Sequence, residues 1–308
     1  MKQKSYFVHP MISLLLLFTL LHGGNETSIE EKKRKFTQQF NPIKAKITTR
    51  GTTFSFSKTK KELDQLYKVA QSTGIGSPEL CEWYDIYTLL LSKREENAYQ
   101  LIPYGNRYIQ ECKQSHYPSE TVLPFIHFRM YKAYSTMDDS ITQRTEHFKQ
   151  FLTLWEKHKL YDNESQLLGQ KEQLAYLLQE NKEHTKALNL NLLIETKAQK
   201  LGLSEEIFMN LYNNIAQNYY DLKELEHAKR YLDKRLTLSQ KYANIHTELN
   251  TLFQLAVLAH ETSDDETAEK LFKHRLTLAN THLDEIDSKT IDSIKQDLAS
   301  FYKKIQTK

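Results

Sequence analysis

The residue types that carry most enzyme chemistry occur in this chain, but not at the spacings that known mechanisms require. Its twelve histidines include no His-Glu-x-x-His pair, since Glu261 follows His260 without a second histidine one turn further on. There is no phosphate-binding glycine loop and no nucleophile elbow, and the eight glycines are scattered. Acidic pairs such as Asp264-Asp265 fall in predicted turns, where helix capping explains them. The sequence therefore predicts a protein that is not an enzyme, with no catalytic residues, no metal and no cofactor.

The two cysteines, Cys81 and Cys112, fall on two helices that we expect to run antiparallel. With a turn near residues 93–95, the first lies about thirteen residues before the turn and the second about eighteen after it, an offset of ~7 Å along the helix axes. In an exported protein the two could pair. The offset nevertheless favours two buried free thiols, because a disulfide needs Cα atoms closer than that geometry gives.

Composition and charge favour a helical protein whose C-terminal part is acidic. Of 308 residues, 39% are hydrophobic and 26% are charged, with eight glycines and six prolines. So few turn-forming residues argue against an all-β fold and favour an all-α one. The net charge of +3 is uneven, because residues 25–61 carry ten lysines and arginines against three acids, which leaves residues 62–308 acidic. Nucleic acid is therefore not an expected partner.

Residues 1–24 have the composition of a secretory signal peptide. Lys2 and Lys4 precede an apolar run of eleven residues, Met11–Leu21. This run is too short to cross a hydrocarbon core of about 30 Å. We therefore expect an exported protein, located in the periplasm, in the cell envelope or outside the cell. Cleavage stays open, and an uncleaved N-terminal membrane anchor is the alternative.

Residues 25–58 form the least regular stretch, where we expect a basic linker. β-Branched and aromatic residues surround Arg50-Gly51 in the segment 46–56, so a small β-hairpin is an alternative. The positive charges of residues 32–61 fit either a solvated exit segment or a contact with an anionic membrane surface.

From Thr59 onward the apolar residues recur at helical spacing, and the predicted helices come in pairs. In residues 208–242 two apolar stripes are joined by a short polar turn, and neither stripe can be buried by one hairpin alone. Ala187, Ala228 and Ala268 recur forty-one and forty residues apart, where two helices would cross. The spacing predicts helical hairpins that stack on one another.

The hairpin in residues 208–242 resembles a tetratricopeptide repeat, a helix–turn–helix unit usually of about 34 residues. The matching residues are Tyr212, Ile215, Ala216 and Tyr219 on the first helix, and Ala228 and Leu232 on the second. Arg235 and Gln240 depart from the pattern, and the period is longer than usual. The resemblance implies a right-handed α-solenoid of TPR-like helical hairpins over residues 59–308, closed by a C-terminal capping helix at residues 288–305.

The first helices of such an array line a concave groove that binds extended peptides or helices, so the resemblance implies a partner-binding face. The projected groove residues are Tyr176, Asn210, Asn213, Asn214, Gln217, Tyr220, Asn250, Phe253, Gln254 and His260, with Gln173, Gln179, Val257, His127, Met130 and Tyr134 as further candidates. A row of carboxamides can pair with a ligand's backbone, because each one both donates and accepts. An ordinary hydrated helix face would show the same residues.

Together these observations predict an exported, non-enzymatic scaffold that binds a protein or peptide partner. The alternative is the sensor portion of a signalling system whose output domain is a separate chain or has been lost. A carboxylate-clamp groove is not expected, because the projected groove positions are mostly amides and aromatics. The identity of the partner and the oligomeric state stay open.

Overall fold

The computed structural model describes residues 28–112 and 119–307, and the predicted signal peptide at residues 1–24 lies outside them. Thirteen α-helices and one 3-10 helix are formed in the described ranges, and no β-strand is formed there. This confirms the expected all-α helical-repeat fold. Of the described residues, those within Met1–Arg94 and Pro103–Ser119 form one compact unit, and those within Glu95–Ile102 and Glu120–Lys308 form a second.

The first unit packs four helices around large aromatic side chains. They are α2 (Ile29–Thr48), α3 (Phe56–Thr73), α4 (Glu79–Leu91) and α5 (Ile102–Glu111). The indole of Trp83 stacks on the rings of Tyr67 and Tyr87, with ring centroids 4.5 and 4.4 Å apart. Its Nε1 donates to the carbonyl oxygen of Leu63 at 3.1 Å, so the polar atom of this buried side chain is satisfied.

Helix α2 replaces the basic linker and the small β-hairpin that the sequence led us to expect at residues 25–58, so that prediction is wrong. Helix α3, which the sequence led us to expect from about Thr59, starts at Phe56. Four apolar residues of α2, Phe36, Phe40, Ile43 and Ile47, are buried on one face at helical spacing. The dense lysines obscured this stripe, and two of them, Lys33 and Lys46, form ion pairs with Glu79 and Glu62 at 3.6 Å.

Cys81 and Cys112 form a disulfide with a Cα–Cα distance of 5.6 Å, so the expectation of two free thiols is wrong. The turn is not confined to residues 93–95. Helix α4 ends at Leu91 and α5 begins at Ile102, and each cysteine lies ten residues from its end of that connection. The two sulfur atoms are therefore level along the helix pair, and the 3-10 helix η1 (Glu95–Leu101) takes up the extra residues.

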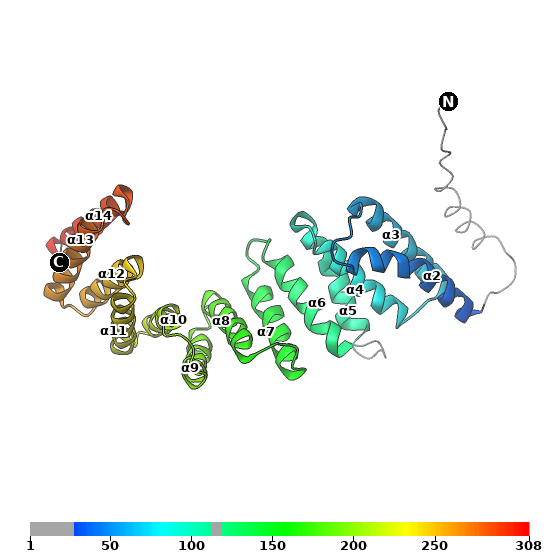
Figure 1. Cartoon of the computed structure of the whole chain (residues 1–308), viewed down its shortest axis with the longest axis horizontal. Helices are drawn as coiled ribbons and strands as arrows, with labels where there is room; N and C mark the ends of the chain where they lie inside the picture. The colour runs from blue at the N-terminus through cyan, green and yellow to red at the C-terminus, as the bar shows by residue number, and fades with distance from the viewer. Residues whose placement is uncertain (1–27, 113–118, 308) are drawn as a thin grey trace, which may run out of the picture. The chain divides into compact units, whose positions relative to one another are not determined.

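The second unit is a series of helices in which neighbours in sequence are neighbours in space. Figure 1 shows α8 to α13 following one another in chain order as hairpins. Besides η1, the helices of this unit are α6 (Ser119–Tyr134), α7 (Ile141–Lys157), α8 (Glu164–Glu180), α9 (His184–Lys200), α10 (Ile207–Asp221), α11 (Leu225–Lys241), α12 (Ile245–Glu261), α13 (Asp265–Thr281) and α14 (Ser288–Gln306). This order produces the TPR-like hairpins α8/α9, α10/α11 and α12/α13.

A residue with left-handed backbone angles follows each helix from α6 to α12. These residues are Asp139, Lys159, Lys182, Gly202, Lys223, Ala243 and Ser263, with φ between 49° and 64°. They recur about every 20 residues, so a helix and its turn form a unit of that length and a hairpin takes about 40 residues. This regular turn explains the long period in the sequence.

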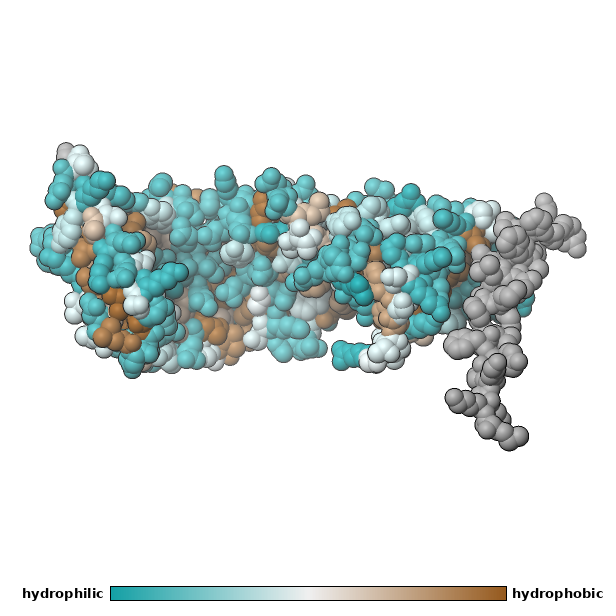
Figure 2. All heavy atoms as spheres, turned by 90° about the horizontal axis from the view of Figure 1, so that it is seen from above, coloured by the Kyte–Doolittle hydropathy of each residue, from teal (hydrophilic) through white to brown (hydrophobic). Residues whose placement is uncertain are grey.

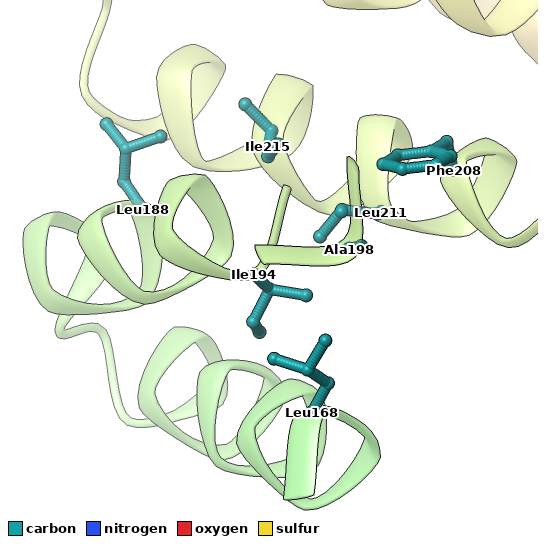
Figure 3. Close-up of a cluster of buried hydrophobic side chains, with 7 residues drawn as sticks. All are labelled: Leu168, Leu188, Ile194, Ala198, Phe208, Leu211 and Ile215. Atoms are coloured by element: carbon teal, nitrogen blue, oxygen red, sulfur yellow. The ribbon is translucent and has the colours of Figure 1, made fainter. Parts of the chain in front are cut away.

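Small and apolar residues hold the hairpins together. The three alanines at matching positions, Ala187, Ala228 and Ala268, are 0 to 1% exposed, as expected where helices cross closely. In Figure 3, Leu168 of α8 and Ile194 of α9 point toward one another in a cluster that continues to α10. At the C-terminal end, Phe301 of α14 packs with Phe272 and Ala268 of α13, so α14 covers the core of the last hairpin.

Candidate functional site

The predicted groove residues lie on α8, α10 and α12, the first helices of three successive hairpins. All ten line one of three cavities along these helices. Tyr176, Asn210, Asn213 and Asn214 line the first, Gln217, Tyr220, Asn250, Phe253 and Gln254 line the second, and His260 lines the third with Phe253. The spacing of the repeat thus brings together residues that are up to 84 positions apart in the sequence.

The first cavity, between α8 and α10, is polar and has a volume of about 320 Å³. It is lined by Gly169, Glu172, Gln173, Tyr176, Asn210, Asn213 and Asn214. Burial raises the pKa of the Glu172 carboxyl above its ordinary value. We refer to this first cavity as the polar cavity. Sequence reasoning missed Glu172, although its place one helical turn before Tyr176 puts both on one face of α8.

The second cavity, between α10, α11 and α12, has a volume of about 290 Å³ and is mainly apolar. We refer to it as the apolar cavity. Its walls are the side chains of Ala216, Ala228, Leu232, Phe253, Val257 and Leu258, and Gln217, Tyr220, Asn250 and Gln254 complete the lining. In Figure 2, apolar surface gathers over the C-terminal helices, at left, between hydrophilic borders. Such a hollow fits one apolar side chain and offers amides to the backbone beside it.

The third cavity lies among α12, α13 and α14 and has a volume of about 170 Å³. Phe253 and Val257 belong to this cavity and to the apolar cavity, so the two lie on either side of the same ridge. His260 hydrogen-bonds to Asp265 through Nδ1 and packs its ring edge-on to Phe301. This histidine therefore has a partner within the fold.

A buried arginine ties the amides of this face together. Arg235 is 7% exposed, and its Nη1 donates to Asn250 Oδ1 and Gln254 Oε1, each at 2.9 Å. Its Nε donates to the carbonyl oxygen of Met209 at 3.1 Å. Burial lowers the pKa of this guanidinium to about 10, which leaves it charged at neutral pH. The only signal in the sequence was that Arg235 breaks the repeat pattern.

Hydrogen bonds already engage several of the predicted amides. Gln254 donates through Nε2 to Asn213 Oδ1 at 2.9 Å, which links α12 to α10 across the repeat boundary. Gln217 donates to Asp221 on its own helix at 3.0 Å. The amides of Asn213 and Gln254 therefore hold repeats together as well as lining the cavities.

Two further candidates from the sequence are not on this face at all. Met130 is 0% exposed and His127 is 8% exposed, so both belong to the interior of α6 and α7, and their projection onto a groove is wrong. His127 Nδ1 lies 3.0 Å from His147 Nδ1, and the ring of Tyr134 stacks on His147. Ile126, Met130 and Ala133 form the buried stripe of α6, so the face that we projected as a groove is the face turned to the core.

Within residues 28–112 and 119–307, no group of three or more histidine, cysteine or acidic side chains is arranged to hold a metal ion. Among the same residues, no helix is both long and apolar enough to cross a membrane.

No family model matches the chain, and no curated protein matches it in sequence. Among solved structures, a putative kinesin light chain of Podosopora anserina with TPR-like repeats has 17% identity and a TM-score of 0.46, covering 75% of this chain and 99% of that one. MamA 41-end from Desulfovibrio magneticus RS-1 has 15% identity and a TM-score of 0.44, covering 66% and 97%. Bacillus thuringiensis PlcR, solved with the peptide PapR7 and DNA, has 14% identity and a TM-score of 0.44, covering 89% and 99%. Identities and TM-scores this low carry no argument about what this chain binds, and its TPR-like architecture rests on its own helical hairpins.

Proposed function

We propose that this chain is a non-enzymatic scaffold that binds an extended segment of a protein partner along α8, α10 and α12. The observation that carries the proposal is the apolar cavity of about 290 Å³, walled by aliphatic and aromatic side chains and bordered by Gln217, Asn250 and Gln254. A volume just below the range of roughly 300–1,000 Å³ for small-molecule sites suits a single side chain that anchors a longer segment.

The borders of the apolar cavity support an extended ligand. Gln217 and Gln254 are half-buried, and Asn250 is exposed, so their carboxamides can reach a segment that passes over the cavity. Each of these carboxamides has a second N–H and a second lone pair besides the hydrogen bonds that it makes within the fold. These remaining groups can pair with the C=O and N–H groups of an extended backbone. Affinity then comes from the anchored side chain, and the hydrogen bonds set the path of the segment.

We further propose that the scaffold acts in an exported compartment. Two observations support this location. The apolar run after Lys2 and Lys4 fits a secretory signal, and the Cys81–Cys112 disulfide suits an oxidising compartment. Intact-mass measurement of the native protein tests it. Loss of about the first 24 residues and of two hydrogens at the disulfide is expected, and a full-length reduced chain from the cytosol would contradict it.

Binding is tested by selecting peptides from a displayed library of random dodecapeptides on the folded chain. Val257 lines the apolar cavity, so the larger side chain of Val257→Trp should occupy part of it, and the affinity of selected peptides should fall at least tenfold. Leu193→Trp is the matched control, because this exposed apolar residue of α9 lines none of the three cavities. Failure to select any peptide, or equal affinity for the two variants, would overturn the proposal. Circular dichroism melts establish that both variants are folded.

A further inference from the structure

The polar cavity lies one repeat before the apolar cavity and differs from it in charge. Its lining contains one carboxyl group, that of Glu172, together with the carboxamides of Gln173, Asn210, Asn213 and Asn214 and the side chain of Tyr176. No lysine, arginine or histidine lines it. The cavity therefore offers a negative charge surrounded by neutral polar groups.

Several other glutamates of helices α7 to α9 have partners of opposite charge. Glu156 pairs with Lys171 at 2.8 Å, Glu180 with Arg144 at 2.6 Å and Glu195 with Lys234 at 3.2 Å. For Glu172, by contrast, the described residues provide neither an ion pair nor a hydrogen-bond donor. Only burial acts on its carboxyl group, and burial raises its pKa.

A ligand that covers this carboxylate must replace the water that solvates it. Covering it with an apolar or neutral group would leave a desolvated charge without a partner, which is costly. An anionic group would add repulsion. A cationic group with several N–H donors can instead pair with the carboxylate and donate to the amide oxygens of the asparagines. Tyr176 is 49% exposed, so its ring can also lie against a cation.

We propose that the polar cavity binds a lysine or arginine side chain of the same extended segment that places an apolar side chain in the apolar cavity. This inference rests on the proposed function. Packed helices lie ~10 Å apart, and an extended chain advances about 3.3 Å per residue. The basic residue therefore lies about three positions from the apolar one, with Asn213 and Gln254 between the two cavities.

The same dodecapeptide library tests this inference. Selected peptides should be enriched in a basic residue three positions from an apolar one. Glu172→Gln should weaken such a peptide at least tenfold, but should leave unchanged a version in which glutamine replaces the basic residue. Glu226→Gln is the matched control, because this exposed glutamate of α11 removes the same charge and lines none of the cavities.

Charge reversal provides the second arm. Glu172→Lys should no longer bind the peptide that carries the basic residue. It should gain affinity for a peptide in which glutamate replaces that basic residue. If Val257→Trp abolishes binding while Glu172→Gln does not, this inference is overturned and the proposed function stands. If no peptide is selected, both are overturned. Glu172→Asp keeps the charge and should retain most of the affinity, which separates loss of charge from loss of fold.

Discussion

The first unit and the hairpins α8 to α13 use opposite kinds of packing. The first unit buries Trp83, Tyr84, Tyr87 and Tyr108 completely and adds a disulfide, so its helices enclose an irregular core. The hairpins instead cross at alanines and repeat the same left-handed turn about every 20 residues. Large side chains can fill the unequal gaps between the helices of an irregular core. Small residues instead let successive helices approach to the same short distance in every repeat.

This difference explains where the candidate site lies. In the hairpins each first helix has one face against its neighbours and one face free, and repetition aligns the free faces of α8, α10 and α12. Polar groups also collect at the repeat boundaries, where the guanidinium of Arg235 donates hydrogen bonds to the side chains of Asn250 and Gln254. Four perturbations test whether the two regions are independent and differently stabilised.

Reduction of the disulfide should have the largest effect, and only on the first unit. The cysteines are 31 residues apart, so the closed loop should contribute about 3–4 kcal/mol to the free energy of unfolding. The two tryptophans allow each unit to be followed, since Trp83 is in the first and Trp155 in the second. In Trp155→Phe the remaining Trp83 reports on the first unit, and the denaturant midpoint of its fluorescence should fall when reductant is added.

The matching variant Trp83→Phe leaves Trp155 as the reporter and should show no shift on reduction. Cys81→Ser with Cys112→Ser controls for effects of the reductant. An equal shift at both tryptophans would mean that the two units unfold together.

Removal of the Arg235 side chain should be the largest single disruption in the hairpins. Arg235→Ala leaves the carbonyl of Met209 and the oxygens of Asn250, Thr251 and Gln254 without their shared donor. We expect a loss of about 3 kcal/mol in the free energy of unfolding, measured by urea titration. Arg230→Ala, an exposed change on the same helix, should alter it by less than about 0.5 kcal/mol.

Acid should weaken the second unit through the buried histidines of α6 and α7. Burial, followed by the neighbouring His147, lowers the pKa of His127 from 6.5 to about 4, while Glu146 acts weakly in the opposite direction. Because the unfolded chain binds the proton first, stability is full above pH 7 and falls by about 2 kcal/mol between pH 7 and pH 5.

Urea midpoints across this range measure the effect with Trp155 as the reporter. His127→Phe should reduce the pH dependence and leave the part due to His147, whose pKa burial also lowers. His246→Asn, at an exposed position of α12, should leave the pH dependence unchanged. An undiminished slope in His127→Phe would assign the acid sensitivity to other groups.

The smallest expected effect concerns the regular turn. Lys223 has a φ of 64°, a conformation that costs a side-chain-bearing residue more than glycine. Lys223→Gly should therefore raise the free energy of unfolding by up to about 1 kcal/mol. Lys229→Gly, within α11, should lower it by a similar amount, and the two variants together measure how much the turn conformation contributes.

The sequence alone was sufficient for the features that depend on local periodicity. Apolar residues at helical spacing identify the helices from α8 to α14 and their pairing, because a stripe must be buried whatever covers it. The same periodicity places Asn210, Asn213 and Gln217 on one face of α10 and Phe253 and Gln254 on one face of α12. It failed at α2, where lysines that form ion pairs in the fold resemble the charges of a linker.

Only the tertiary structure decided which distant groups meet. The disulfide depends on where α4 and α5 end, and a shift of one residue moves a helix position by about 1.5 Å, which periodicity does not resolve. Likewise, Arg235 finds acceptors 15 to 26 residues away, and Glu172 finds no cation. The helical faces are local properties of the chain, but the pairing or isolation of a charge depends on what the neighbouring helices bring to it.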